Sequence, residues 1–224
     1  MFVTLEGIEG AGKSTQAARL AERLRAGGRS VWLTREPGGT PLAGAIRAML
    51  LHPEASLVAL ANAGWAPGDA PAEPMLPLTE ALLLSAARAQ HVPAIRERLA
   101  GGDIVVCDRY ADATRAYQGA ARGFDMRTII TLEDMATGGL RPDLTLLLDI
   151  VPEVGQARKV QGSAQGGEWN RLDAEDVAFH QRVRAGYLEL AAAEPQRILV
   201  FDASQSPDTL AAIIWETVQA RLPS

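Results

Sequence analysis

The sequence has little of what a secreted or membrane-bound protein needs. Its one cysteine, Cys107, rules out an internal disulfide and suggests a reducing compartment. No apolar run approaches the roughly 20 residues of a membrane-spanning helix. The short stretch before Glu6 has no basic leader, so no signal peptide is expected. We therefore expect a cytoplasmic protein without a membrane association.

Basic residues are outnumbered by acidic ones, 22 to 27. The net charge of −5 at pH 7 argues against the broad basic face that binding to nucleic acid requires. A few arginines would still suffice to hold a small anionic substrate. Of the 22 basic residues only two are lysine, Lys13 and Lys159, so a lysine in this chain indicates a local chemical need.

Unbroken apolar segments, each followed by a helical pattern, predict a parallel sheet covered by helices on both faces. Strands are expected over residues 2–5, 31–34, 104–107, 144–148 and 198–201. Helices are expected over residues 13–26, 41–51, 79–99, 112–119, 125–137, 173–194 and 207–222, with another beginning near 152. With no internal repeat and no linker, residues 1–224 are predicted to form one three-layer α/β domain.

Two segments interrupt this pattern. Residues 52–78 contain five prolines among glycine and alanine, which predicts a long excursion over the surface without a functional explanation. Residues 161–170 are rich in glycine and glutamine and predict a second loop.

The first strand leads into a phosphate-binding loop. Residues 7–14 match G-x-x-x-x-G-K-[ST] at every fixed position, between a predicted strand and a predicted helix. The glycines let backbone N–H groups curve around a phosphate at a helix N-terminus. Lys13 would contact the β and γ phosphates, and the Ser14 hydroxyl would bind Mg²⁺. The expected nucleotide-binding residues are Gly7, Ile8, Glu9, Gly10, Ala11, Gly12, Lys13, Ser14 and Thr15, in a three-layer P-loop NTPase fold.

An acidic residue and a basic residue follow the apolar strand 104–107. Asp108 lies where P-loop enzymes keep the carboxylate that holds Mg²⁺ or its waters. Arg109 comes next and would face the phosphates from the carboxyl edge of the sheet. The alternative, an Asp–Arg pair that merely caps a strand, is less favoured behind a buried strand. The expected metal ligands are Ser14, Asp108 and Glu9.

Six motifs follow one another along nearly the whole chain, at residues 5–16, 34–40, 87–90, 108–110, 116–119 and 141–145. In this order they resemble the bacterial branch of the thymidylate kinase family. The Arg-Glu-Pro-Gly-Gly-Thr motif beginning at Arg35 and the Ala-Tyr-Gln-Gly motif beginning at Ala116 are much more specific than the P-loop. The resemblance implies phosphoryl transfer from ATP to dTMP with Mg²⁺, giving ADP and dTDP, by a homodimer.

The resemblance also implies roles at the dTMP site. Arg88 would hydrogen-bond thymine, with Thr114 and Gln118 assisting. Tyr117 would pack beside the sugar and exclude a 2′-hydroxyl. In isolation, Arg88 would be taken for a solvated helix residue and Tyr117 for core.

The acceptor phosphate would be held by Arg35 and Arg109. Glu36 would orient an arginine or a metal-bound water, and the loop 203–205 would border the adenine. A phosphate monoester, with its second pKa at about 6, is mostly ionised at neutral pH, so no general base is required. The obstacle is repulsion between two polyanions, which Lys13, Arg35, Arg109 and Mg²⁺ would offset.

Two departures from the family pattern leave alternatives open. Leu84 stands where family members usually have a phenylalanine that stacks on thymine. Leucine keeps the apolar contact but lacks the aromatic ring for stacking. The mobile lid, about residues 158–171, has no arginine within 160–170, so the donor phosphates would need Arg158, Lys159 or Arg171; we take both arginines as catalytic candidates. Leu84 and the segment 52–78 favour a related nucleotide or deoxynucleoside kinase of shifted specificity. The arginine-poor lid favours a nucleotide-binding protein with weak catalysis.

Overall fold

The computed structural model describes residues 1–65, 73–166 and 169–222. Five parallel strands form one sheet in the order β2-β3-β1-β4-β5. They are β1 (Phe2–Glu6), β2 (Val31–Arg35), β3 (Ile104–Asp108), β4 (Leu144–Asp149) and β5 (Ile198–Asp202). The predicted five-stranded parallel sheet is therefore confirmed, with each end within one residue of its expected position.

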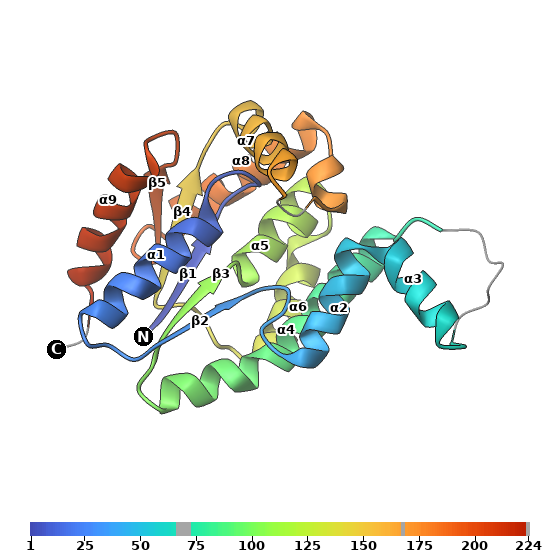
Figure 1. The fold of residues 1–224 in the computed structure, drawn as a ribbon, viewed down its shortest axis with the longest axis horizontal. Coiled ribbons are helices and arrows are strands. Elements are labelled where there is room, and N and C mark those ends of the chain that lie inside the picture. The colour runs from blue at the N-terminus through green and yellow to red at the C-terminus, as the bar shows by residue number, and fades with distance from the viewer. Residues whose placement is uncertain (66–72, 167–168, 223–224) are drawn as a thin grey trace.

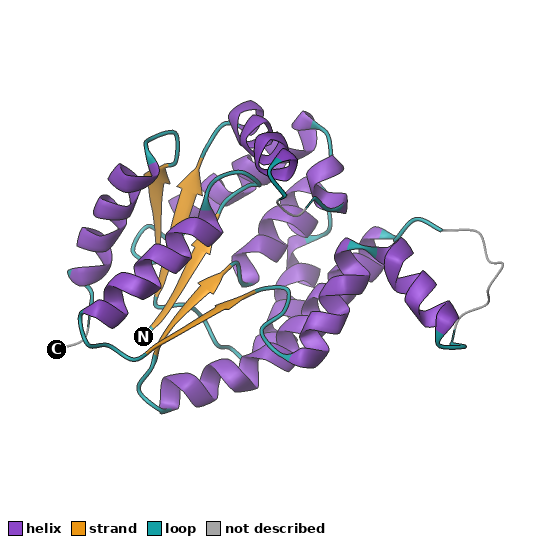
Figure 2. Cartoon of the chain, viewed as in Figure 1, coloured by secondary structure: helices purple, strands orange, loops and turns teal. Residues whose placement is uncertain are grey.

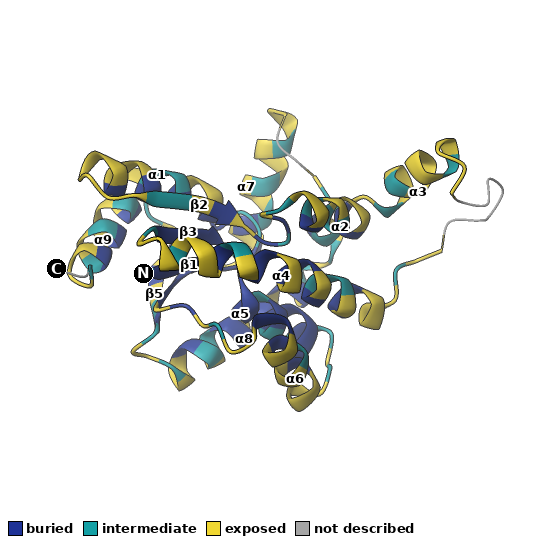
Figure 3. Ribbon diagram, turned by 90° about the horizontal axis from the view of Figure 1, so that it is seen from below, coloured by how far each residue is buried: buried dark blue, intermediate teal, exposed yellow. Residues whose placement is uncertain are grey.

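Helices cover both faces of this sheet (Figures 1 and 2). Their bounds are α1 (Lys13–Ala26), α2 (Pro41–Leu51), α3 (Pro53–Asn62), α4 (Pro77–Ala100), α5 (Ala111–Thr114), α6 (Met126–Thr137), α7 (Pro152–Ala164), α8 (Val177–Ala193) and α9 (Pro207–Gln219). A π-helical turn (Arg115–Ala121) follows α5, and a 3₁₀ turn (Arg171–Ala174) precedes α8. Helices α1 and α9 lie on one face, and α4, α5 and α8 on the other (Figure 3).

The three inner strands are buried on both faces. Val105 and Cys107 of β3 pack with Ile95 of α4, whereas Val106 lies in the cluster that contains Leu20 of α1. Burial on both sides removes any reason for polar residues to alternate with apolar ones. This explains why these strands appear in the sequence as unbroken apolar runs.

The structure places a helix within residues 52–78, where the sequence predicted a surface excursion without regular structure. Ten of these residues form α3, which begins at Pro53, a residue suited to a first helical turn. None of its residues is buried, and it extends away from the body beside α2 (Figure 1). Helix α4 begins at Pro77 rather than Thr79. Residues 66–72 lie outside the described part of the chain.

Two further boundaries differ from expectation. Helix α7 continues to Ala164, so the predicted loop 161–170 is shorter; residues 167–168 are not described. Helix α8 begins at Val177 rather than 173, because the Asp176 carboxylate accepts from the backbone N–H of Phe179 and caps the helix there. Among the described residues, no helix has the length and apolar character to cross a bilayer.

A close contact between α8 and the π-helical turn gives a first test of packing. A Cβ atom on Gly186 would lie 2.5 Å from the Cβ of Ala120. We expect Gly186→Ala to lower the free energy of unfolding, because overpacking costs about 1–3 kcal/mol and the gain in helix propensity is at most about 1 kcal/mol. Urea denaturation would measure the difference. Adding Ala120→Gly should recover part of the loss; a single variant as stable as the parent would contradict this packing.

Candidate functional site

A cavity of about 290 Å³ opens at the carboxyl edge of the sheet. Segments far apart in the sequence line it, because the ends of parallel strands meet at one edge. Most of the predicted site residues are among those that line it, namely Glu9, Gly10, Gly12, Lys13, Ser14, Thr15, Arg35, Glu36, Leu84, Arg88, Asp108, Arg109, Thr114, Tyr117 and Gln118. Gly7, Ile8 and Ala11 complete the P-loop behind them.

The P-loop brings a lysine and a hydroxyl to the cavity. Lys13 is buried, and its Nζ donates to the carbonyl oxygen of Ile8 at 2.7 Å. Burial and the neighbouring charge of Arg109 lower the pKa of Lys13 to about 8. The Ser14 hydroxyl donates to the Asp108 carboxylate, so two of the three predicted metal ligands are in contact.

Helix α7 packs directly on the backbone of this loop. A Cβ on Gly10, whose φ is +74°, would meet the carbonyl oxygen of Gly155 at 2.0 Å. A Cβ on Gly155 would meet the carbonyl oxygen of Glu9 at 2.5 Å. Gly155 therefore sets how closely α7 approaches the loop. It carries no motif in the sequence, and sequence reasoning did not single it out.

Arg109 forms the centre of a dense polar network. Its Nη1 donates to the Gly7 carbonyl oxygen at 2.9 Å and to the Tyr187 hydroxyl at 3.1 Å. Its Nη2 donates to Glu9 Oε1 at 2.7 Å and to the Tyr117 hydroxyl at 3.0 Å. The guanidinium thus lies between the P-loop and the π-helical turn.

Glu9 is held in its ionised form. Burial by itself would raise the pKa of its carboxyl group. The charge of Arg109, a contact with His180 and the hydroxyl of Tyr117 outweigh burial and hold this pKa well below its usual range. The P-loop therefore presents a carboxylate to the cavity at neutral pH.

Arg88 is buried on α4 with only 3% of its surface exposed, so the interpretation as a solvated helix residue is wrong. Its Nε donates to Glu36 Oε2 at 2.8 Å, its Nη1 to Thr114 Oγ1 at 3.0 Å, and its Nη2 to the Tyr110 carbonyl oxygen at 3.1 Å. These bonds fix the plane of the guanidinium at the cavity wall.

His91, one turn further along α4, was missed by sequence reasoning. It is fully buried, with Nδ1 3.0 Å from Glu36 Oε1 and Nε2 2.9 Å from Thr34 Oγ1. Gly39 lies against its ring, where a Cβ would be 2.2 Å from Nε2. The imidazole therefore fixes one carboxylate oxygen of Glu36, while Arg88 binds the other. Its spacing of three residues from Arg88 is the one signal that would have indicated it.

Two other residues predicted for the dTMP site also line the cavity. Gln118 donates from Nε2 to Glu80 Oε1 at 2.7 Å, while its buried Oε1 has no partner within the described part of the chain. Leu84 lines the cavity with an aliphatic side chain, half-buried on α4.

The three cations that flank the lid lie in different places. Arg158 donates to the carbonyl oxygens of Ala203 and Ser204, at 2.7 and 3.3 Å, on the predicted adenine loop. Arg171 pairs with Glu80. Neither lines the cavity, whereas Lys159 does, with Nζ 3.2 Å from an Asp173 carboxylate oxygen.

Comparison with known proteins agrees with this arrangement. A model of the thymidylate kinase family matches residues 5–63 and 70–214. Curated thymidylate kinases from Synechococcus sp. (strain JA-3-3Ab) and Deinococcus radiodurans are 48% and 47% identical to this chain, with 99% of the chain and 97% of each relative covered. The chain belongs to the thymidylate kinase family. A crystal structure of thymidylate kinase from Ehrlichia chaffeensis is 31% identical, with a TM-score of 0.71 and 98% of both chains covered.

Membership of the thymidylate kinase family confirms the resemblance that the motifs predicted. The chain is an ATP-using transferase of nucleotide biosynthesis, and its activity is that of a thymidylate kinase. The alternatives of a shifted specificity and of weak catalysis gain no support from these relatives. The roles of individual site residues stay predictions.

The two glycines of α7 give a matched test of the P-loop contact. Gly155→Ala should weaken ATP binding and lower stability, because the new methyl group must displace the Glu9 carbonyl oxygen. Gly162→Ala, with nothing within 4 Å of the added Cβ, should be neutral or stabilising by up to about 1 kcal/mol. Calorimetric titration with a non-hydrolysable ATP analogue would measure the affinities. Equal affinities in both variants would show that α7 does not position the loop.

Proposed function

We propose that this cavity binds dTMP beside the terminal phosphates of ATP and catalyses transfer of the γ-phosphoryl group between them. The observation that carries the proposal is that Lys13, Arg35 and Arg109 line the same 290 Å³ space as the buried Arg88. Three cations would offset the repulsion between the two substrates, and a fixed guanidinium would orient the acceptor base.

Arg88 is suited to reading the edge of a thymine ring. A guanidinium has five N–H donors, and three of them are used within the protein. The remaining two can donate to a carbonyl oxygen such as thymine O4. Gln118 lines the same cavity, while Leu84 gives apolar contact and Tyr117 lies beside the sugar.

The phosphates would be held from three directions. Arg35 and Arg109 bind the acceptor phosphate, and Lys13 bridges the donor phosphates. The acceptor oxygen arrives ionised, so the protein positions it without removing a proton. Mg²⁺ would be held by the Ser14 hydroxyl and the Asp108 carboxylate, with Glu9 close by. Such oxygen ligands fit a cation that takes its other ligands from phosphate and water.

Two broader proposals accompany this one. A homodimer is supported by large exposed apolar side chains on α3 and around the start of α4, namely Leu57, Val58, Leu60, Leu76 and Leu78. A cytoplasmic location is supported by the single cysteine, which is unpaired and buried.

A panel of nucleoside monophosphates tests the proposed reaction. In a coupled assay of ADP release, dTMP should give the highest kcat/KM among dTMP, dUMP, dCMP and dGMP. Lys13→Ala should lower the rate with dTMP by roughly 100-fold or more, since it removes a cation from the developing charge. Equal or better turnover of another monophosphate would overturn the substrate assignment, and full activity of Lys13→Ala would overturn the mechanism.

The lid cation can be identified separately. We propose that Lys159 fills this role, because it alone of Arg158, Lys159 and Arg171 lines the cavity. Lys159→Met should lower kcat by roughly 10- to 1000-fold with little change in KM for dTMP. Arg158→Met, the matched control, should chiefly raise KM for ATP through the loop 203–205. A larger fall of kcat in Arg158→Met or Arg171→Met would assign the role to that arginine instead.

A further inference from the structure

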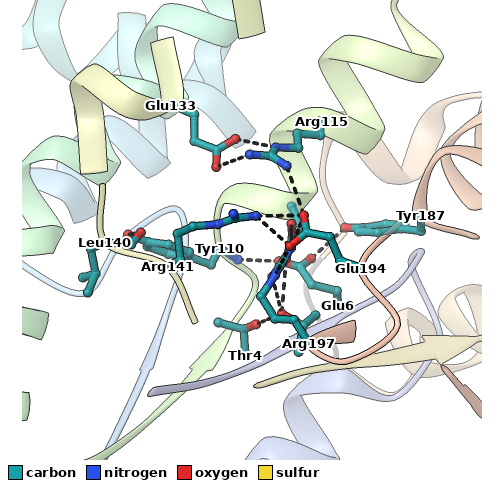
Figure 4. A network of polar contacts seen from close by, with 12 residues as sticks. Thr4, Glu6, Tyr110, Arg115, Glu133, Leu140, Arg141, Tyr187, Glu194 and Arg197 are labelled. Atoms are coloured by element: carbon teal, nitrogen blue, oxygen red, sulfur yellow. Dashed lines mark hydrogen bonds and ion pairs between the residues drawn. The ribbon is translucent and has the colours of Figure 1, made fainter. Parts of the chain in front are cut away.

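A single buried carboxyl group contacts both the backbone next to Arg109 and a side-chain partner of its guanidinium. Glu6, the last residue of β1, is fully buried. Its Oε1 accepts from the backbone N–H of Tyr110 at 2.7 Å, and its Oε2 accepts from the Tyr187 hydroxyl at 2.7 Å (Figure 4). The same hydroxyl accepts from Arg109 Nη1 at 3.1 Å. Glu6 is therefore linked to the backbone beside Arg109 and, through Tyr187, to its guanidinium.

The backbone of Arg109 needs such support. Its φ of 71° is in the left-handed region, the only such value for a non-glycine residue within the described ranges. This conformation costs on the order of 1–3 kcal/mol and persists only where the surrounding structure holds it. The Arg109 N–H donates to the Leu5 carbonyl oxygen at 3.0 Å, and the next N–H is held by Glu6. The end of β1 thus fixes both peptide groups that flank the strained residue.

The contacts of the guanidinium fall into two groups. Glu9 and Tyr117 line the cavity, where an entering acceptor would meet them. Tyr187 and the Gly7 carbonyl oxygen are not part of the cavity lining, and Tyr187 approaches Arg109 from the side of α8. The bond from Tyr187 can therefore persist while Arg109 exchanges its cavity-side partners for a phosphate.

We propose that Glu6 and Tyr187 form a positioning pair that sets the direction of Arg109 before the acceptor phosphate binds. Neither residue touches the substrate; both act through Arg109. The proposal rests on the proposed function of Arg109 as a ligand of the acceptor phosphate.

The protonation of Glu6 suits this arrangement. Burial and the charge of Asp112 raise its pKa to about 8, against the opposing effects of Arg109, Tyr187 and the Tyr110 N–H. Arg197 grips both carboxylate oxygens of Asp112, at 2.7 and 2.8 Å. At neutral pH Glu6 is thus mostly uncharged, which leaves Arg109 free of a second competing carboxylate. The uncharged carboxyl group donates from Oε2 to the Tyr187 hydroxyl, the reverse of the direction in its ionised form. An amide at this position would make the same two contacts, since it can accept from the Tyr110 N–H and donate to the Tyr187 hydroxyl.

Tyr187→Phe is the decisive variant, because it removes one oxygen atom and leaves the packing of the ring intact. We expect kcat/KM for dTMP to fall roughly 10- to 100-fold, mainly through KM, with the affinity for an ATP analogue unchanged. Glu6→Leu should lower kcat/KM for dTMP by a similar factor, whereas Glu6→Gln should keep the activity of the parent enzyme at pH 7. Thr4→Val is the control: it removes a buried hydroxyl from the same strand, 2.8 Å from Thr145 Oγ1, and should leave kcat/KM unchanged.

Several results would overturn the pair. These are a Tyr187→Phe enzyme within twofold of the parent, a Glu6→Gln enzyme as impaired as Glu6→Leu, or parallel losses of ATP and dTMP binding in proportion to lost stability. Arg109→Ala in the same series separates the two proposals. If Arg109→Ala leaves dTMP kinetics unchanged, the proposed role of Arg109 fails. If it is impaired, Tyr187→Phe should cause no further loss in that background; an additive loss would show that Tyr187 acts elsewhere.

Discussion

The site depends on keeping several positive charges close together in a partly buried space. Without phosphate, such charges repel one another and lose their hydration. The protein offsets this by pairing the arginines with its own acids, Arg109 with Glu9 and Arg88 with Glu36. Breaking a buried pair by removing one partner costs far more than the pair itself contributes, so these acids are as necessary to the site as the arginines.

The sheet makes this concentration of charge possible. In the order β2-β3-β1, three neighbouring strands end at one edge and carry Arg35, Asp108 and the P-loop. Strands β3 and β1 are buried on both faces, so their ends cannot shift without disturbing the core. Helix α4 then brings Arg88 to the cavity wall, and α8 brings the Tyr187 hydroxyl to Arg109. The packing of the core thus fixes the positions of the site residues.

The sequence predicted the strands and the P-loop because both leave local signals, an unbroken apolar run and a dense glycine pattern. It could not predict α3, since that helix buries no face and therefore shows no apolar periodicity. It also missed Glu6, His91 and Tyr187, which resemble ordinary strand or helix residues in isolation. The bond from Tyr187 to Glu6 joins residues 181 positions apart. Such a partnership exists only once the chain has folded.

The scarcity of lysine has a practical consequence. Lys13 and Lys159, the only two in the chain, both line the cavity. Apart from the terminal amine, an acylating reagent directed at primary amines therefore finds its targets only inside the site. Peptide mass spectrometry of those two adducts would report occupancy of the cavity and movement of α7 without any engineered label. No other lysine in the chain would react with the reagent.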